Sequence, residues 1–257
     1  MTTWIRFESG GATNFGTFDG DKITIHHGNM FDNPSATSET VALADVNVLT
    51  PCEPSKMLAL WNNYGMLATK LELTPPPEPL YFIKANSSFA AQKETVHRPK
   101  NYDGPVIFEG ELGVVIGKAT KEISEEDAAD HIFGYTCIND ITAAGIIPKD
   151  ETFAQWSRAK GYDGFGVFGP VISTDVDPLE KNLTVVLNGD VRQDYPLSDM
   201  IFKPHQLVSL LSHDMTLLPG DVICVGTNVG VGSMKLPSND VAVTIDGIGT
   251  LENVFKN

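Results

Sequence analysis

The stretch Glu109-Gly110-Glu111-Leu112-Gly113-Val114-Val115-Ile116-Gly117 places two acidic residues directly before an apolar run. Such a run is typical of a buried strand, and residues i and i+2 of a strand point to the same face of its sheet. The carboxylates of Glu109 and Glu111 are therefore expected to leave the sheet side by side. Two like charges this close raise each other's pKa unless a cation lies between them.

A third acidic residue, Asp140, ends another apolar stretch, residues 134–139. Together with Glu109 and Glu111 it would complete an all-carboxylate set, which suits Mg²⁺ or Mn²⁺ and is poor for zinc. Two solvated glutamates and an aspartate that caps a turn produce the same spacing, and more commonly. The spacing alone therefore leaves both explanations open.

Composition limits the class of protein. The chain has 257 residues, of which 42% are hydrophobic and 20% are charged, as expected for a globular protein of one or two domains. Its net charge of −15 argues against nucleic acid or an anionic membrane as a partner. An anionic substrate would need local compensation by a metal or by nearby lysine and arginine side chains.

Targeting signals are not evident in the sequence. No apolar run approaches the roughly 20 residues of a membrane span, and the first residues lack the basic and apolar regions of a signal peptide. The three cysteines, Cys52, Cys137 and Cys224, are scattered and form no paired framework. This usage predicts a reducing, cytoplasmic location.

Strand patterns dominate the chain. Residues 1–50 read as short strands joined by tight turns, such as Asp19-Gly20-Asp21. The Pro-rich junction at residues 50–55 predicts a boundary between a small N-terminal β domain (1–50) and a catalytic domain (51–257). Helices are expected from Ser124 through Ile132 and from Pro204 onward. The predicted fold class is mainly β with a few short helices.

Several short segments occur in a fixed order along the chain: FEGELGVVIGK (residues 108–118), GYTCIND (134–140), WSRAKGYD (156–163), FGP (168–170), NG (188–189), DMIF (199–202), LPGD (218–221) and GTNVGVG (226–232). Each segment alone is a weak signal. The ordered set resembles the fumarylacetoacetate hydrolase family over about residues 56–254.

The resemblance implies a β-roll catalytic domain that pairs as a homodimer. It also implies that one Mg²⁺ or Mn²⁺ per chain is held by Glu109, Glu111 and Asp140. Lys160 would bond the substrate oxygen or a metal-bound water and balance the three carboxylates, so it is a predicted catalytic residue together with Thr227. Substrate contacts are implied for four residues: Tyr64, Lys84, Gly226 and Thr227.

The sequence departs from the family where its hydrolytic members activate water. The histidine and glutamate of that pair are replaced by Leu67 and Lys70, and residues 143–145 stand where the family has an arginine. Cleavage of a C–C bond by water needs a base that generates hydroxide. Ordinary hydrolase activity is therefore not expected from these residues.

Residues 71–84 resemble the subgroup that isomerises 2-hydroxyhepta-2,4-diene-1,7-dioate and decarboxylates its tricarboxylate precursor. This resemblance implies an isomerase or decarboxylase of 2-oxo dicarboxylates in aromatic-acid breakdown, with the metal as electron sink. One alternative is an acylpyruvate or fumarylpyruvate hydrolase whose base comes from elsewhere. The other is a catalytically silent member that binds a small anion or serves in assembly.

Overall fold

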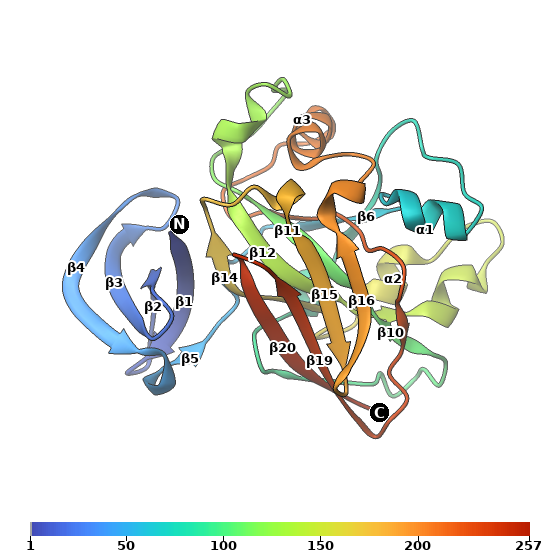
Figure 1. Ribbon diagram of the computed structural model, residues 1–257, viewed down its shortest axis with the longest axis horizontal. Coiled ribbons are helices and arrows are strands. Elements are labelled where there is room, and N and C mark those ends of the chain that lie inside the picture. Colours follow the sequence, from blue (N-terminus) through green and yellow to red (C-terminus); the bar gives the residue numbers. More distant parts are fainter. Residues whose placement is uncertain (1) are drawn as a thin grey trace.

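Strands are the main secondary structure of the protein, and its α-helices are few and short (Figure 1). The structure, a computed structural model, describes residues 2–257. None of the helices within this range is long and apolar enough to cross a membrane. The mainly β fold class predicted from the sequence is confirmed. The α-helices are α1 (Gly65–Lys70), α2 (Trp156–Lys160) and α3 (Pro204–Asp214).

One large mixed sheet runs through the molecule in the order β4-β3-β2-β1-β14-β12-β11-β17-β6-β7, with β5 on β1 and β8 on β14. Most neighbours are antiparallel, whereas β17 pairs with β6 and β14 with β8 in parallel. Its strands are β1 (Thr3–Ser9), β2 (Ala12–Phe18), β3 (Lys22–Asn29), β4 (Asp32–Ala42), β5 (Asn47–Val48), β6 (Met57–Trp61), β7 (Leu80–Lys84), β8 (Phe89–Ala90), β11 (Gly110–Ile116), β12 (Ile132–Asp140), β14 (Gly166–Ser173) and β17 (Val222–Cys224).

Two smaller sheets complete the fold. One has the order β16-β15-β19-β20-β9 and the other the order β13-β10-β18. The turn between β15 and β16 contains Asn188 and Gly189, both with positive φ, as the sequence signal for a tight hairpin requires. The strands are β9 (Thr95–His97), β10 (Val106–Phe108), β13 (Thr142–Ala143), β15 (Asn182–Leu187), β16 (Asp190–Pro196), β18 (Gly232–Ser233), β19 (Ser238–Ile245) and β20 (Gly249–Lys256).

The N-terminal strands curl into the separate lobe at the left of Figure 1. They are nevertheless part of the large sheet, because β1 pairs with β14 through Thr3↔Ser173 and Ile5↔Val171. The predicted tight turn at residues 19–21 joins β2 to β3. The predicted boundary near residue 51 stays a prediction, since this continuous pairing does not locate it.

The main hydrophobic core lies between the large sheet and the sheet that contains β15, β19 and β20. Leu112 and Val114 of β11 face this core, whereas Val115 faces a second apolar cluster with Met57 and Cys224. Gly110 is needed for the close approach of the sheets, because a Cβ there would lie 2.3 Å from Val185 Cγ2. By strand alternation, Glu111 shares the face of Val115.

The helix predicted from Ser124 through Ile132 is not formed. Within the segment the structure has a 3₁₀ turn, Ala128–His131, and β12 already begins at Ile132. At Ile132 the backbone already pairs with β11, because Ile132 is the partner of Ile116. Sheet pairing therefore overrides the local helix signal of the acidic first turn. The helix predicted from Pro204 onward is present as α3.

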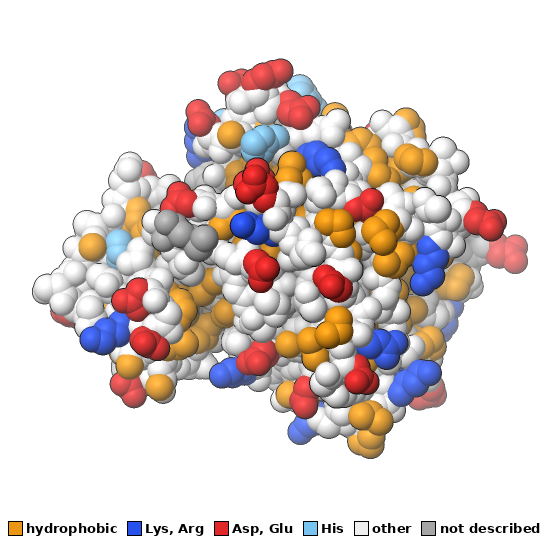
Figure 2. Space-filling view, viewed as in Figure 1, with side chains coloured by type: hydrophobic (Ala, Val, Ile, Leu, Met, Phe, Trp, Pro, Cys, Tyr) orange, Lys and Arg blue, Asp and Glu red, His pale blue; other side chains and the backbone are white. Residues whose placement is uncertain are grey.

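Charged side chains of both signs are interspersed on the face seen in Figure 2, rather than gathered into one basic patch. This distribution accords with the acidic balance of the chain. A nucleic-acid surface would instead show basic residues clustered on one face or stripe, and the view in Figure 2 has none.

Candidate metal centre

Two neighbouring strands bring three carboxylates together. Glu111 lies in β11, Glu109 directly precedes that strand, and Asp140 ends β12. Gly110 pairs with Asn139 in the register of these strands, and the Asp140 amide donates to the Glu109 carbonyl at 2.8 Å. Carboxylate oxygens of all three acidic residues lie within 4.8 Å of one another. The strand alternation expected from the sequence therefore produces the predicted cluster.

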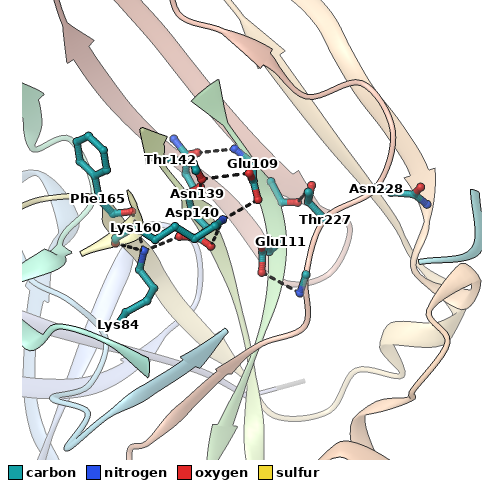
Figure 3. A network of polar contacts seen from close by, with 12 residues as sticks. Lys84, Glu109, Glu111, Asn139, Asp140, Thr142, Lys160, Phe165, Thr227 and Asn228 are labelled. Carbon is teal, nitrogen blue, oxygen red and sulfur yellow. Dashed lines mark hydrogen bonds and ion pairs between the residues drawn. The ribbon is translucent and has the colours of Figure 1, made fainter. Parts of the chain in front are cut away.

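Two buried lysines face the carboxylates (Figure 3). Lys160 Nζ lies 2.8 Å from Glu109 Oε2 and 2.5 Å from Asp140 Oδ2. Lys84 Nζ lies 2.5 Å from Asp140 Oδ1 and also donates to the carbonyls of Lys160 and Phe165. The side chains of Lys84 and Asp140 are 0% and 1% exposed. Asp140 is thus fixed from both oxygens by ammonium groups.

Burial and neighbouring charges perturb every acidic group. Burial raises the pKa of Glu111 well above its ordinary value, and the charge of Asp140 raises it further. Burial likewise raises the pKa of Glu109, in spite of Lys160. Burial would also raise the pKa of Asp140, but Lys160 and Lys84 outweigh it and the pKa is lowered. The cluster therefore holds Glu111 in a place that disfavours its ionised form.

The donor set fits a divalent cation. When all three carboxylates are ionised, the two ammonium groups leave one negative charge uncompensated in a buried site. Glu111 contacts neither lysine directly: its Oε2 accepts a hydrogen bond from the Gly226 amide at 2.9 Å. A hard cation with oxygen ligands at about 2.1 Å would supply the missing positive charge. Mg²⁺ or Mn²⁺ is therefore the type of ion that these residues suit.

The glycine-rich segment 226–232 lies beside the carboxylates. Thr227 Oγ1 donates to the Gly110 carbonyl at 2.9 Å and accepts from Gln193 Nε2 at 3.0 Å. Gly226 and Thr227, both predicted to contact substrate, are thus placed at the site. Gln193 was missed by the sequence reasoning. Gln193 is one of several polar residues in β16, where buried and exposed side chains alternate. Nothing in the neighbouring sequence indicates that its side chain points toward the carboxylate site.

A second group of hydrogen bonds, centred on Asp199, also holds the glycine-rich segment 226–232. Asn228 Nδ2 donates to Asp199 Oδ2 at 2.9 Å, and the Met66 amide at the start of α1 donates to that same oxygen at 2.9 Å. One carboxylate therefore connects the glycine-rich segment to α1. Asn228 lies at the right of Figure 3, away from the carboxylate cluster.

The other predicted contacts are placed differently. The hydrogen bonds of Lys84 all go to protein oxygens, so contact with a substrate would require one of them to be given up. Tyr64 is fully buried and packs against Tyr195 with ring centroids 5.2 Å apart. Its hydroxyl has no hydrogen-bond partner within residues 2–257. The substrate contacts of Lys84 and Tyr64 stay predictions.

Helix α1 carries the two residues that replace the water-activating pair. Leu67 is buried in the core, and Lys70 is exposed in the last turn. A leucine side chain has no group that can accept a proton, and Lys70 places a cationic side chain where the family's hydrolytic members have a glutamate. The structure therefore offers no water-activating base at these two positions.

The sequence matches the model of the family described as fumarylacetoacetate (FAA) hydrolase C-terminal over residues 56–256. A second family model, Rv2993c-like N-terminal, matches residues 3–51. The first of these matches spans the strands and α2 that carry the carboxylates and Lys160.

Individual relatives are also similar over most of the chain. The crystal structure of 2-hydroxyhepta-2,4-diene-1,7-dioate isomerase from Mycobacterium marinum has a TM-score of 0.90 and 36% identity, covering 100% of this chain and 98% of that one. Oxaloacetate tautomerase YisK of Bacillus subtilis is 34% identical over 91% of this chain and 83% of its own. The 4-hydroxyphenylacetate degradation bifunctional isomerase/decarboxylase of Salmonella dublin is 34% identical over 91% of this chain and 55% of its own.

Proposed function

The chain belongs to the fumarylacetoacetate hydrolase family, and from this premise we propose that it is a divalent-metal-dependent isomerase or decarboxylase. Its substrates are 2-oxo dicarboxylates and the 2-hydroxydienoic acids that are their enol forms. The observation that carries this proposal is the cluster of Glu109, Glu111 and Asp140 with Lys160 bonded to two of them. Leu67 and Lys70 stand where the family's hydrolytic members have the histidine and glutamate that activate water, and this difference argues against hydrolysis.

The three carboxylates would hold one Mg²⁺ or Mn²⁺. When bound, the ion would act as a Lewis acid and withdraw electron density from the carboxylate and keto oxygens of the substrate. Lys160 is positioned to hold a proton at the substrate's 2-oxygen, because its ammonium group lies among the carboxylates and is 3% exposed. Burial would lower the pKa of Lys160, but the charges of Asp140 and Glu109 outweigh burial and raise it.

Such an arrangement favours the enolate of a 2-oxo acid. A fixed ammonium group in a site that excludes water stabilises the negative charge that develops on oxygen, without reorganisation of solvent. Protonation of this enolate at C3 gives the keto form, and its protonation at the 2-oxygen gives the enol. Loss of CO₂ from a β-oxo acid passes through the same charge distribution. Neither reaction needs a hydroxide, so neither needs the base that is missing at α1.

Support from relatives is at the level of reaction type. The Mycobacterium marinum structure is named an isomerase of a hydroxydienedioate, the Salmonella dublin protein an isomerase/decarboxylase, and the Bacillus subtilis protein an oxaloacetate tautomerase. Isomerisation is named in the first two descriptions, and tautomerisation, which interconverts enol and keto forms, is named in the third. We further propose a homodimer, and a reducing cytoplasm in keeping with three buried, unpaired cysteines.

The test is a parallel assay of the Mg²⁺-loaded protein with the enol of oxaloacetate, a 2-hydroxydienedioate and an acylpyruvate. Decay of the enol absorbance and release of CO₂ follow the proposed reactions, and loss of the acylpyruvate chromophore follows hydrolysis. We expect turnover of at least one of the first two substrates and little of the third. Rapid acylpyruvate cleavage without enol–keto conversion would overturn the proposal.

A further inference from the structure

Three half-buried aromatic rings gather beside the carboxylate site. Trp61 ends β6, Phe82 lies in β7, and Trp156 begins α2. The Trp61 and Trp156 ring centroids are 4.7 Å apart, and the Phe82 and Trp156 rings stack with an interplanar angle of 16° and centroids 5.8 Å apart. We call these three residues the aromatic cluster. Each ring keeps part of its surface exposed, and Phe82 also packs against the second apolar cluster.

The aromatic cluster is joined to the site through β7 and α2. Phe82 and Lys84 are two residues apart in β7 and point to the same face, and Lys84 bonds Asp140. Trp156 and Lys160 are four residues apart in α2 and therefore share one helix face. The Lys160 ammonium lies over the Phe82 ring, 5.7 Å from its centroid. The same ammonium group thus contacts both the carboxylates and the aromatic cluster.

A second connection runs through β6. The Gly226 amide bonds Glu111, and Gly226 also packs on the backbone of Leu60, whose carbonyl oxygen lies 3.3 Å from the place a Cβ would occupy. Trp61 is the next residue. Trp61 lies on the same face of β6 as Met57 and Ala59, which belong to the second apolar cluster. Trp61 therefore borders the carboxylate site on the face from which Glu111 projects.

The segment after Asp140 adds no charge to this surrounding. Residues 141–148 contain no lysine, arginine, aspartate or glutamate. They form β13 and all but the last residue, the exposed Lys149, of the 3₁₀ turn Ala144–Lys149, and this turn packs against α2. Lys84 and Lys160 are already committed to Asp140 and Glu109. A substrate held at the carboxylates would therefore meet the aromatic rings of α2 and β7 on one side. After Asp140 it would meet the uncharged segment of residues 141–148.

We propose that the aromatic cluster is a substrate subsite that stacks a flat, unsaturated group attached to C3 of a 2-oxo acid, such as an aryl ring or a conjugated diene. This proposal rests on the enol–keto activity proposed above and specifies its substrates. The protein then prefers extended conjugated or aryl 2-oxo acids to a short saturated one such as oxaloacetate. The reaction needs no further reactant: the enol O–H proton is lost and C3 gains a proton.

The first experiment compares the enols of phenylpyruvate and oxaloacetate with the Mg²⁺-loaded protein. We expect a larger kcat/KM for phenylpyruvate. The variant Trp156→Ala should lower the ratio of the two kcat/KM values about tenfold, as expected for loss of an aromatic stacking contact together with its buried area. Phe82→Leu should lower that ratio in the same direction. Ile83→Ala is the matched control, because Ile83 is 46% exposed and points to the opposite face of β7.

The second experiment measures binding without turnover. Phenyllactate and malate are 2-hydroxy acids that cannot tautomerise. Phenyllactate carries a phenyl ring on C3, whereas malate carries a carboxylate there. Calorimetry should show tighter binding of phenyllactate, and Trp156→Ala should remove that advantage. Two of the three tryptophans in the chain belong to the aromatic cluster, so phenyllactate should also change tryptophan emission more than malate does.

The outcomes separate the two proposals. If oxaloacetate turns over well and phenylpyruvate poorly, with malate bound more tightly than phenyllactate, the subsite proposal is wrong and the enol–keto activity stands. A Trp156→Ala variant that keeps the wild-type substrate ratio also overturns the subsite. If neither of these enols nor a 2-hydroxydienedioate turns over, the proposed activity is wrong, and the binding comparison still decides whether the aromatic cluster recognises an aryl acid.

Discussion

Gly110 donates its amide hydrogen to the side-chain oxygen of Gln193 across 3.0 Å. Gly110 is the residue between the two glutamates, and the Gln193 side-chain nitrogen bonds Thr227 and the carbonyls of Asn228 and Val229. One buried amide side chain therefore joins the carboxylate strand to the glycine-rich segment. Tyr195 adds a 2.7 Å bond to the Gly110 carbonyl from the same strand.

This relationship predicts that Gln193 positions the metal ligands. Gln193→Leu should weaken Mg²⁺ binding about tenfold, in the range observed when residues that orient ligands are removed. Calorimetric titration of the metal-free protein at fixed pH measures the change. Asp194→Asn, an exposed neighbour in β16, is the control and should bind Mg²⁺ as the wild type does. A folded Gln193→Leu protein with unchanged affinity would contradict the prediction.

Metal binding should stabilise the fold, because Glu111 is buried and forms an ion pair with neither Lys84 nor Lys160. At a free Mg²⁺ concentration one hundred times Kd, the gain is about 2.7 kcal/mol, which corresponds to a Tm increase of roughly 5–10 °C for a chain of this size. Differential scanning calorimetry with EDTA and with Mg²⁺ measures it. Glu111→Gln should abolish the shift, and equal Tm values for the wild type in both conditions would rule out the site.

Lys160→Met should lower kcat more than it changes KM. The variant keeps the length of the side chain and removes the charge that is expected to stabilise the substrate's 2-oxygen, which commonly costs about 10²–10³ in rate. Steady-state kinetics with the best enol substrate separates the two constants. Loss of the ammonium also leaves Asp140 and Glu109 less compensated, so CD spectra and Tm must be recorded with Mg²⁺ present. Wild-type kcat in a folded variant would exclude the role.

Gly110→Ala should destabilise the protein strongly. The added methyl group would lie 2.3 Å from Val185 and 2.9 Å from Leu183, both in the sheet that packs on β11. Overpacking of this kind costs about 1–3 kcal/mol. Urea denaturation measures the loss. Gly189→Ala makes no close contact and controls for the general effect of replacing glycine, although its positive φ adds some strain of its own. Equal midpoints for the wild type and Gly110→Ala would show that the two sheets can separate at this point.

Sedimentation at micromolar concentration should report about twice the chain mass of 27.8 kDa, as expected for a closed twofold pair. The family relationship is the basis of this prediction, and a concentration series will distinguish a stable dimer from weak association. A single species of chain mass throughout the series would contradict it.

Strand alternation was sufficient to predict that Glu109 and Glu111 leave the sheet side by side, whereas their meeting with Asp140 was predicted from the resemblance to the family. Helix α3 was equally predictable from Pro204 and its apolar face. The segment from Ser124 to Ile132 was not, since its capping signal is local whereas its pairing with β11 depends on residues distant in sequence. The hydrogen-bond partners of Lys84 and Gln193 show the same limit. Lys84 bonds Asp140, which lies more than fifty residues away in the sequence, and Gln193 bonds Thr227, which lies more than thirty residues away.

The pairing of β1 with β14 has a practical consequence for anyone who wishes to shorten this chain. β14 is held on one side by β12, the strand that ends in Asp140, and on the other by β1. A fragment that starts after the Pro-rich segment would expose the backbone amides and carbonyls of residues 171–173 that β1 now covers. Such an uncovered edge recruits strands from other molecules. A fragment that lacks β1 is therefore expected to aggregate through this edge more readily than a chain that keeps it.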